Sequence, residues 1–266
     1  MNINADAIRH DFFVAIGKYK DNMIPDILCC ENDAELIMNV LAKVPFINNN
    51  KPNQITLTTR INPAVCTKTN ILNIISKLSL TVKEDDMLLL MISCHGYSHN
   101  DETYLIPSDA VLGDVSTYIN FTWIKEILDE VYTKFKVILV DACHSGDSAI
   151  KFKSTAVSLK FREETKLINQ LLKESHGLCY ATSCKHNQVA LIQPDGMYSI
   201  WFSSLANAIT AQMTLCEDDI IRMDAVLSSC LYQTTLLADK YWSCKQTPFC
   251  VLKIEGLLPL GLKLKN

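Results

Sequence analysis

Residues that interrupt helices and strands are scarce in this sequence, with 8 glycines and 8 prolines among 266 residues. Long apolar stretches are absent as well. The run Met87–Ile92 has the length of a strand, whereas a helix that spans a bilayer needs about 20 apolar residues. We therefore expect neither low-complexity linkers nor insertion into a membrane.

The chain has no excess of positive charge and no secretory signal. Its formal net charge is −4, and its 25 lysines and arginines are scattered among 29 acidic residues. Phosphate binding needs a dense basic surface, so we expect no nucleic-acid partner. Asp6 and Arg9 stand where a signal peptide would need an apolar run. These features predict a cytoplasmic protein.

Cysteine, by contrast, is abundant, with 11 residues. In a cytoplasmic protein most of these thiols should be reduced and buried, so the sequence predicts no disulfides. Cys179, Cys184 and His186 lack the paired Cys-x-x-Cys spacing of a zinc site. We therefore predict no metal at these residues.

Strand-like and helix-like segments alternate along the chain. Short apolar runs predict strands at Phe12–Ile16, Gln54–Thr59, Met87–Ser93, Phe135–Val140, Leu178–Thr182 and Phe249–Ile254. Between them, residues 71–78 and 124–131 have apolar side chains at helical spacing, and residues 36–41 form a similar stripe that Asn32 or Asp33 can cap. This alternation predicts an α/β fold, with a mostly parallel six-stranded sheet and helices on both faces.

Two of the predicted strands end in residues suited to nucleophilic catalysis. Met87–Ser93 leads into Cys94-His95-Gly96, and the strand ending at Val140 leads into Asp141-Ala-Cys143-His-Ser-Gly146. The carboxyl ends of parallel strands meet at one edge of a sheet, where functional loops gather. The sequence therefore predicts that the two motifs face each other.

The residue types fit the attack of a thiol on a carbonyl group. A thiol of ordinary pKa is mostly protonated near neutral pH, so Cys143 needs a base, and His95 can accept its proton and later protonate the leaving amine. The backbone amides of Gly96 and Cys143 would stabilise the oxyanion of the intermediate. His95 and Cys143 are therefore the predicted catalytic dyad.

These motifs resemble those of caspase/metacaspase-like cysteine peptidases, above all metacaspases and prokaryotic caspase-like proteins. His95 precedes Cys143 by about 50 residues, as in caspases. The resemblance extends through Ala15-Ile16-Gly17 and Glu31-Asn32-Asp33-Ala34, and to Gly196-Met-Tyr-Ser199. It implies one caspase-like domain over residues 1–266 that cleaves protein or peptide substrates. Within it, residues 1–146 correspond to the large portion with the dyad, 147–176 to the linker and 177–266 to the small portion.

The sequence departs from animal caspases around the specificity pocket. Those enzymes cut after aspartate, with a glutamine two residues before the cysteine and arginines around the pocket, whereas this chain has Asp141 there and no arginine in Leu28–Asp33. Carboxylates of Asp141 and Asp33 favour an arginine or lysine side chain by charge-assisted hydrogen bonds. The resemblance also places Tyr198 at the substrate cleft.

Several alternatives stay open at this point. The favoured interpretation is a cysteine endopeptidase that cleaves after arginine or lysine. A catalytically quiet domain that binds a partner as an adaptor, an aspartate-specific peptidase, or a hydrolase of a non-peptide amide would share these motifs. We expect a monomer, although caspases pair through the edge strand, here Phe249–Ile254.

No cofactor is required by this chemistry, but calcium is possible because many metacaspases bind it. Oxygen ligands are available in the acidic residues that follow His95, namely Asp101, Glu102, Asp109 and Asp114. These residues are sparse and equally fit solvated turns.

Overall fold

The fold is known from a computed structural model that describes residues 6–46, 51–60, 62–100, 102–142, 178–185, 188–215, 220–253 and 258–262. The central sheet contains β1 (Arg9–Ala15), β2 (Asn53–Thr58), β3 (Met87–Ser93), β7 (Phe135–Asp141), β8 (Leu178–Thr182) and β10 (Phe249–Lys253). Their order across the sheet is β10-β8-β7-β3-β1-β2. Each of the six predicted strands overlaps one of these strands.

The sheet is parallel except at one edge. β1 pairs in parallel with β2 and β3, and β7 pairs in parallel with β3 and β8. β10 runs antiparallel to β8. The prediction of an α/β fold with a mostly parallel six-stranded sheet is confirmed.

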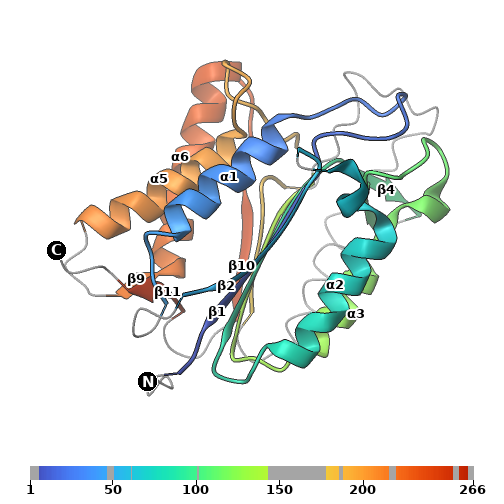
Figure 1. Ribbon diagram of the computed structural model, residues 1–266. Coiled ribbons are helices and arrows are strands. Elements are labelled where there is room, and N and C mark those ends of the chain that lie inside the picture. The colour runs from blue at the N-terminus through green and yellow to red at the C-terminus, as the bar shows by residue number, and fades with distance from the viewer. Residues whose placement is uncertain are drawn as a thin grey trace.

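Helices cover both faces of this sheet, as predicted (Figure 1). One face is covered by α2 (Lys68–Thr81) and α3 (Phe121–Asp129), and the other by α1 (Cys29–Leu41), α5 (Ile200–Leu215) and α6 (Met223–Trp242).

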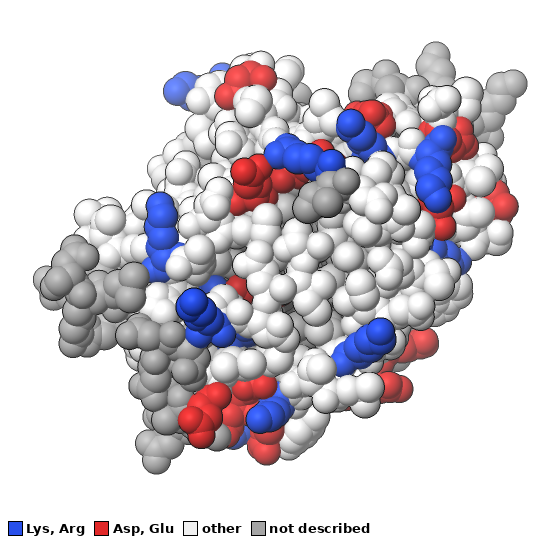
Figure 2. All heavy atoms as spheres, viewed as in Figure 1, with Lys and Arg blue, Asp and Glu red and all other residues white. Residues whose placement is uncertain are grey.

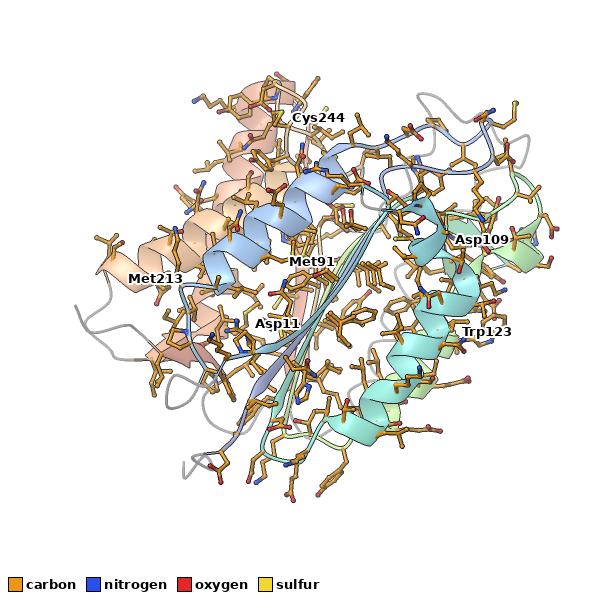
Figure 3. All side chains as sticks on the ribbon, in the orientation of Figure 1. Asp11, Met91, Asp109, Trp123, Met213 and Cys244 are labelled. Atoms are coloured by element: carbon orange, nitrogen blue, oxygen red, sulfur yellow. The ribbon has the colours of Figure 1, made fainter. Side chains whose placement is uncertain are left out.

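The side chains of β1 alternate between these two faces because successive residues of a strand point in opposite directions. Phe12 and Val14 belong to the core beneath α2 and α3, and Phe13 belongs to the core beneath α1, α5 and α6. Asp11 and Met91 lie on the α1 side of the sheet (Figure 3). Burial on both faces explains why β1 and β3 are buried throughout.

The start of α1 differs from the prediction. Its N-cap is Leu28, which makes no side-chain capping hydrogen bond, so the expectation that Asn32 or Asp33 caps this helix is wrong. Both side chains lie inside the helix and bond to residues 197–199 instead. By contrast, Thr67 caps α2 and Asn120 caps α3 by accepting backbone N–H groups.

Two small sheets accompany the central one and were not predicted. One contains β4 (Gly96–His99), β5 (Glu102–Leu105) and β6 (Ile119–Asn120), and the other contains β9 (Ile220–Arg222) and β11 (Pro259–Leu262). Short 3-10 helices cover Pro63–Cys66 and Val115–Thr117. In the ranges that the structure describes, no helix has the length and apolar character needed to cross a membrane.

A fully buried arginine joins the first strand to the last. Arg9 pairs with Asp11 through Nε and Nη2, at 2.7 and 2.9 Å. Its Nη1 donates to the carbonyl oxygens of Val44 and Leu260, at 2.9 and 3.1 Å. Arg9 and Asp11 are 0% and 2% exposed, so this ion pair lies inside the protein.

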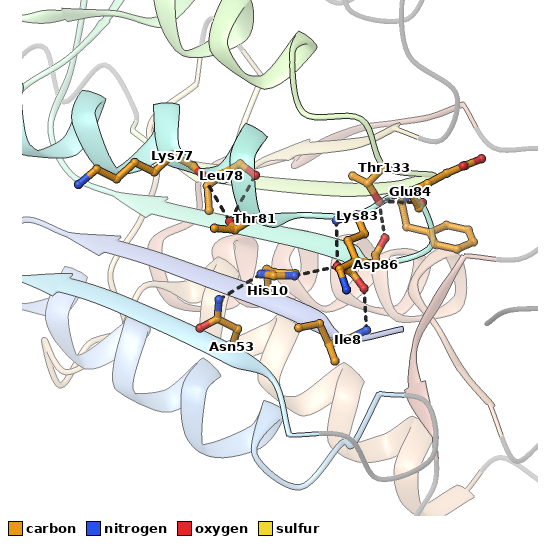
Figure 4. Close-up of polar contacts among 11 residues, drawn as sticks. Ile8, His10, Asn53, Lys77, Leu78, Thr81, Lys83, Glu84, Asp86 and Thr133 are labelled. Atoms are coloured by element: carbon orange, nitrogen blue, oxygen red, sulfur yellow. Dashed lines mark hydrogen bonds and ion pairs between the residues drawn. The ribbon is translucent and has the colours of Figure 1, made fainter. Parts of the chain in front are cut away.

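A second buried polar network lies at the amino ends of the strands (Figure 4). His10 Nε2 lies 3.0 Å from Asp86 Oδ2, and His10 Nδ1 lies 3.2 Å from Asn53 Nδ2. Asp86 also accepts the backbone N–H groups of Ile8 and Lys83, both at 2.9 Å. His10 is therefore a structural histidine, at the end of the sheet opposite to His95.

Charges of both signs are mixed on the molecular surface. In Figure 2, blue and red side chains alternate over the face shown, and the described residues form no extended basic area there.

Candidate active site

The carboxyl ends of β3 and β7 lie side by side. Ser93, the last residue of β3, is in register with Asp141, the last residue of β7. The N–H of Cys94 donates to the Asp141 carbonyl oxygen at 3.1 Å, which extends the pairing by one residue. His95 follows directly at this edge. Cys143 and the predicted linker 147–176 lie outside the described residues, so the meeting of the dyad stays a prediction.

His95 is held at both its backbone and its ring. Its N–H donates to the hydroxyl of Tyr19 at 3.0 Å, and its Nε2 lies 2.9 Å from the carbonyl oxygen of Pro25. A carbonyl oxygen can only accept, so this contact requires the hydrogen on Nε2. In the neutral imidazole, Nδ1 then carries the lone pair that can accept a proton.

Burial keeps this imidazole neutral. His95 is 7% exposed, and removal from water lowers its pKa below the ordinary value, with partial opposition from the hydrogen bond to Pro25. A base must be neutral to accept a proton, so this environment suits the role predicted for His95.

Gly96 follows His95 and begins β4, where it pairs with Leu105. Its backbone is half-buried. It therefore lies next to the candidate base, as an oxyanion donor must, and its part in binding the oxyanion stays a prediction.

The two predicted pocket carboxylates are brought together from α1 and β7. Asp33 is 0% exposed and Asp141 is 8% exposed. Burial raises the pKa of Asp33 well above its ordinary value, and the charge of Asp141 raises it further. Asp33 Oδ1 accepts the N–H of Ser199 at 2.9 Å. Its Oδ2 has no hydrogen-bond partner among the described residues.

The turn that contains Tyr198 is attached to α1. Asn32 Nδ2 donates to the carbonyl oxygen of Met197 at 2.7 Å, next to the bond between Asp33 and Ser199. Gly196 has a φ of +73°, which glycine adopts without strain. Tyr198 is half-buried between these anchored residues. Its contact with substrate stays a prediction.

Several residues that shape this region were missed by the sequence analysis. Tyr19 and Pro25 contact His95, Ser199 binds Asp33, and Gln246 anchors the segment that leads to Ser199. These residues act through contacts between loops that are distant in the sequence. No short sequence motif indicates such contacts.

Most of the described thiols are poor nucleophiles. None of the nine described cysteines forms a disulfide with another described residue. Burial raises the pKa of Cys66, Cys94 and Cys230 to about 12. The pKa of Cys30 is also raised well above its ordinary value, first by its hydrogen bond with Cys29 and then by burial. Such thiols remain protonated and unreactive near neutral pH.

Of the acidic residues predicted as possible calcium ligands, Asp101 lies outside the described residues, and Glu102, Asp109 and Asp114 have partners within the protein. Asp109, labelled in Figure 3, accepts the N–H of Lys68 at 2.9 Å, and Asp114 accepts the N–H of Ser116 at 3.0 Å. Within the described ranges, no three histidine, cysteine or acidic side chains form a group that could hold a metal. Calcium dependence stays a prediction.

The fold and the sequence identify the class of this protein. The family model described as "Caspase domain" matches residues 11–255. The chain therefore belongs to the caspase-domain family of cysteine peptidases, which act on protein substrates. Comparison with curated protein sequences gives no match.

Solved structures share this fold. Caspase-1 from Spodoptera frugiperda matches with a TM-score of 0.67 and 12% identity, over 100% of this chain and 94% of that chain. A protein from Geobacter sulfurreducens matches with a TM-score of 0.60 and 13% identity, over 94% of each chain. At such identities the likeness concerns the fold.

Proposed function

We propose that this protein is a cysteine endopeptidase that uses Cys143 and His95 and cleaves after arginine or lysine. Family membership supports peptidase chemistry, and the buried, neutral environment of His95 supports its role as the base. The preference for arginine or lysine is supported by one observation. Asp33 Oδ2 is buried near the charge of Asp141 and has no hydrogen-bond partner among the described residues.

The reaction uses successive proton transfers at one nitrogen of His95. His95 Nδ1 accepts the proton of the Cys143 thiol, and the thiolate attacks the carbonyl carbon of the scissile peptide bond. The N–H groups of Gly96 and Cys143 stabilise the resulting oxyanion. As the carbon–nitrogen bond breaks, the imidazolium returns its proton to the leaving amine. Water, deprotonated by His95, then attacks the thioester, and as the carbon–sulfur bond breaks the imidazolium returns this proton to the Cys143 thiolate.

A basic side chain of the substrate would neutralise the negative charge of the proposed pocket. Two carboxylates in a buried site repel each other, and a guanidinium or ammonium group between them would remove this repulsion. It would also donate a hydrogen bond to Asp33 Oδ2, a charge-assisted bond worth about 1.5–3 kcal/mol. An aspartate side chain would meet like charge there.

Fluorogenic peptides test the proposal. We expect the purified full chain to cleave peptides that end in arginine or lysine and to ignore those that end in aspartate. Cys143→Ala and His95→Ala should each abolish cleavage. Cys244→Ala, which removes an exposed thiol, is the matched control and should retain activity. Assays with calcium and with a chelator would establish its calcium dependence.

Two results would contradict the proposal in different ways. Preferential cleavage after aspartate would refute the assignment of Asp33 and Asp141 while leaving the dyad intact. If no peptide is cut, and an arginine chloromethylketone peptide fails to label Cys143, the chain is a catalytically quiet domain. Mass spectrometry of the labelled protein identifies the alkylated cysteine.

A further inference from the structure

One loop, which follows β1, contacts His95 at three points. Within it, Tyr19 accepts the His95 N–H, and Pro25 offers its carbonyl oxygen to Nε2, at 3.0 and 2.9 Å. The ring of Tyr19 also packs against the imidazole, with ring centroids 5.3 Å apart and planes inclined by 36°. The backbone, ring face and one ring nitrogen of His95 are therefore all held by this loop.

The hydroxyl of Tyr19 links two strand ends. It accepts from His95, which follows β3, and donates to the carbonyl oxygen of Ile16, which follows β1, at 3.2 Å. Tyr19 is 8% exposed, and burial raises its pKa well above the ordinary value. The hydroxyl therefore stays neutral, and it can donate one hydrogen bond while accepting another.

We propose that Tyr19 is a positioning residue that sets the orientation of the His95 imidazole. Its hydroxyl fixes the backbone from which the ring projects, and its own ring limits rotation of the imidazole. Together they hold Nε2 at the Pro25 oxygen and leave Nδ1 as the ring nitrogen that can accept a proton. This inference rests on the proposed function, because it concerns the base of that reaction.

Tyr19→Phe isolates the hydroxyl, since the phenyl ring keeps the packing against His95. We expect kcat for an arginine peptide to fall about tenfold, the effect of losing one hydrogen bond that aligns a reacting group. KM should stay unchanged, because Asp33 and Asp141 are untouched. The pH at which iodoacetamide alkylates Cys143 should rise, because a misaligned imidazole accepts the thiol proton less readily.

Tyr118→Phe is the matched control. Tyr118 is 1% exposed, and its hydroxyl accepts the N–H of Gly113 at 3.0 Å, so both tyrosines accept a backbone N–H at the same distance. Both variants should lower Tm, and Tyr19→Phe should lower it more, because the Tyr19 hydroxyl makes two hydrogen bonds. We expect Tyr118→Phe to keep the wild-type kcat and alkylation profile.

The possible outcomes are distinguishable. Equal kcat and equal alkylation profiles in wild type and Tyr19→Phe would overturn the positioning role. If wild type is inactive and Cys143 is not labelled by the chloromethylketone probe, the proposed function fails and this inference fails with it. Should Tyr19→Phe not fold, 3-fluorotyrosine at position 19 keeps the hydroxyl but makes its oxygen a weaker acceptor. A lowered kcat would support the proposal, and an unchanged kcat would overturn it.

Discussion

Asp33 has two carboxylate oxygens in different surroundings. Oδ1 accepts the N–H of Ser199 and so fixes the turn before α5, whereas Oδ2 has no partner in the described structure. A buried polar atom without a partner costs free energy, on the order of 1–3 kcal/mol. A ligand that donates to Oδ2 would remove this cost, which supports the proposed role of Asp33 in binding a basic side chain.

The raised pKa of Asp33 predicts a pH-dependent affinity for basic substrates. Because burial and Asp141 raise this pKa, the carboxyl group stays protonated at pH values where an ordinary aspartate is charged. As pH falls through the raised pKa, the pocket loses negative charge. We expect kcat/KM for arginine peptides to fall at acidic pH, mainly through a rise in KM, as initial rates across the acidic range would measure.

Asp33→Asn should reproduce the acidic state at neutral pH. The amide can still accept the Ser199 N–H but has no charge, so we expect KM for arginine peptides to rise about tenfold or more. The control is Asp85→Asn, which removes the same charge at a residue paired with Lys134. An unchanged KM in Asp33→Asn would show that the basic side chain binds elsewhere.

Single residues were predictable where their chemistry is visible in the sequence. His95 and Asp141 could be proposed as site residues because they lie within two residues of the ends of apolar runs that predict strands. Tyr19 could not be found in this way, because tyrosine is equally common in cores and loops. Pro25 acts through its carbonyl oxygen, which every residue has.

At the scale of elements, the segment between β8 and α5 is held by a buried amide. Gln246 is 0% exposed, and its Nε2 donates to the carbonyl oxygen of Ser183 at 3.0 Å. Its Oε1 accepts the N–H of Leu191, also at 3.0 Å. One side chain therefore fixes both halves of the segment that leads to Tyr198.

Gln246→Ala should loosen this segment and destabilise the fold. Two buried backbone groups would lose their partners, so we expect a loss of about 2–4 kcal/mol in the free energy of unfolding. Urea denaturation measures this loss. Gln233→Ala, which removes a bond to Ser229 one turn earlier in α6, should cost less than about 1 kcal/mol. Equal losses in the two variants would contradict the anchoring role of Gln246.

The elements of the central sheet were predictable because their strands are buried on both faces. The strands of the two small sheets could not be predicted. Strands β4 and β5 have four residues each and mix polar with apolar side chains, so they show no clear period. Pairing of β9 with β11 joins segments about 40 residues apart, which no local pattern reveals. In α6, the exposed Tyr232 and Leu236 obscure the apolar stripe.

At the scale of the whole molecule, the buried pair of Arg9 and Asp11 should dominate stability. Replacing Arg9 by methionine would leave the Asp11 carboxylate buried without its partner, at a cost of about 3–5 kcal/mol. The double variant Arg9→Met/Asp11→Leu should recover much of this loss, as chemical denaturation would show. Lys134→Met breaks ion pairs at a half-exposed site and should cost less than about 1 kcal/mol.

The order of strands across the sheet was beyond prediction. Alternating segments indicate parallel crossovers, but they do not say on which side of β3 each later strand is added. Nor does the sequence show that β10 reverses direction. These features depend on how helices of different length fill the two faces, which is a property of the assembled protein.

The hydrogen bond from Arg9 to the carbonyl oxygen of Leu260 cannot form early in protein synthesis. The two residues are 251 positions apart, so a nascent chain on the ribosome has the arginine long before it has the carbonyl oxygen that Arg9 binds. Asp11 and the carbonyl oxygens of Leu41 and Val44 are available to Arg9 much earlier. The full set of bonds around the guanidinium therefore forms only after Leu260 has left the ribosome.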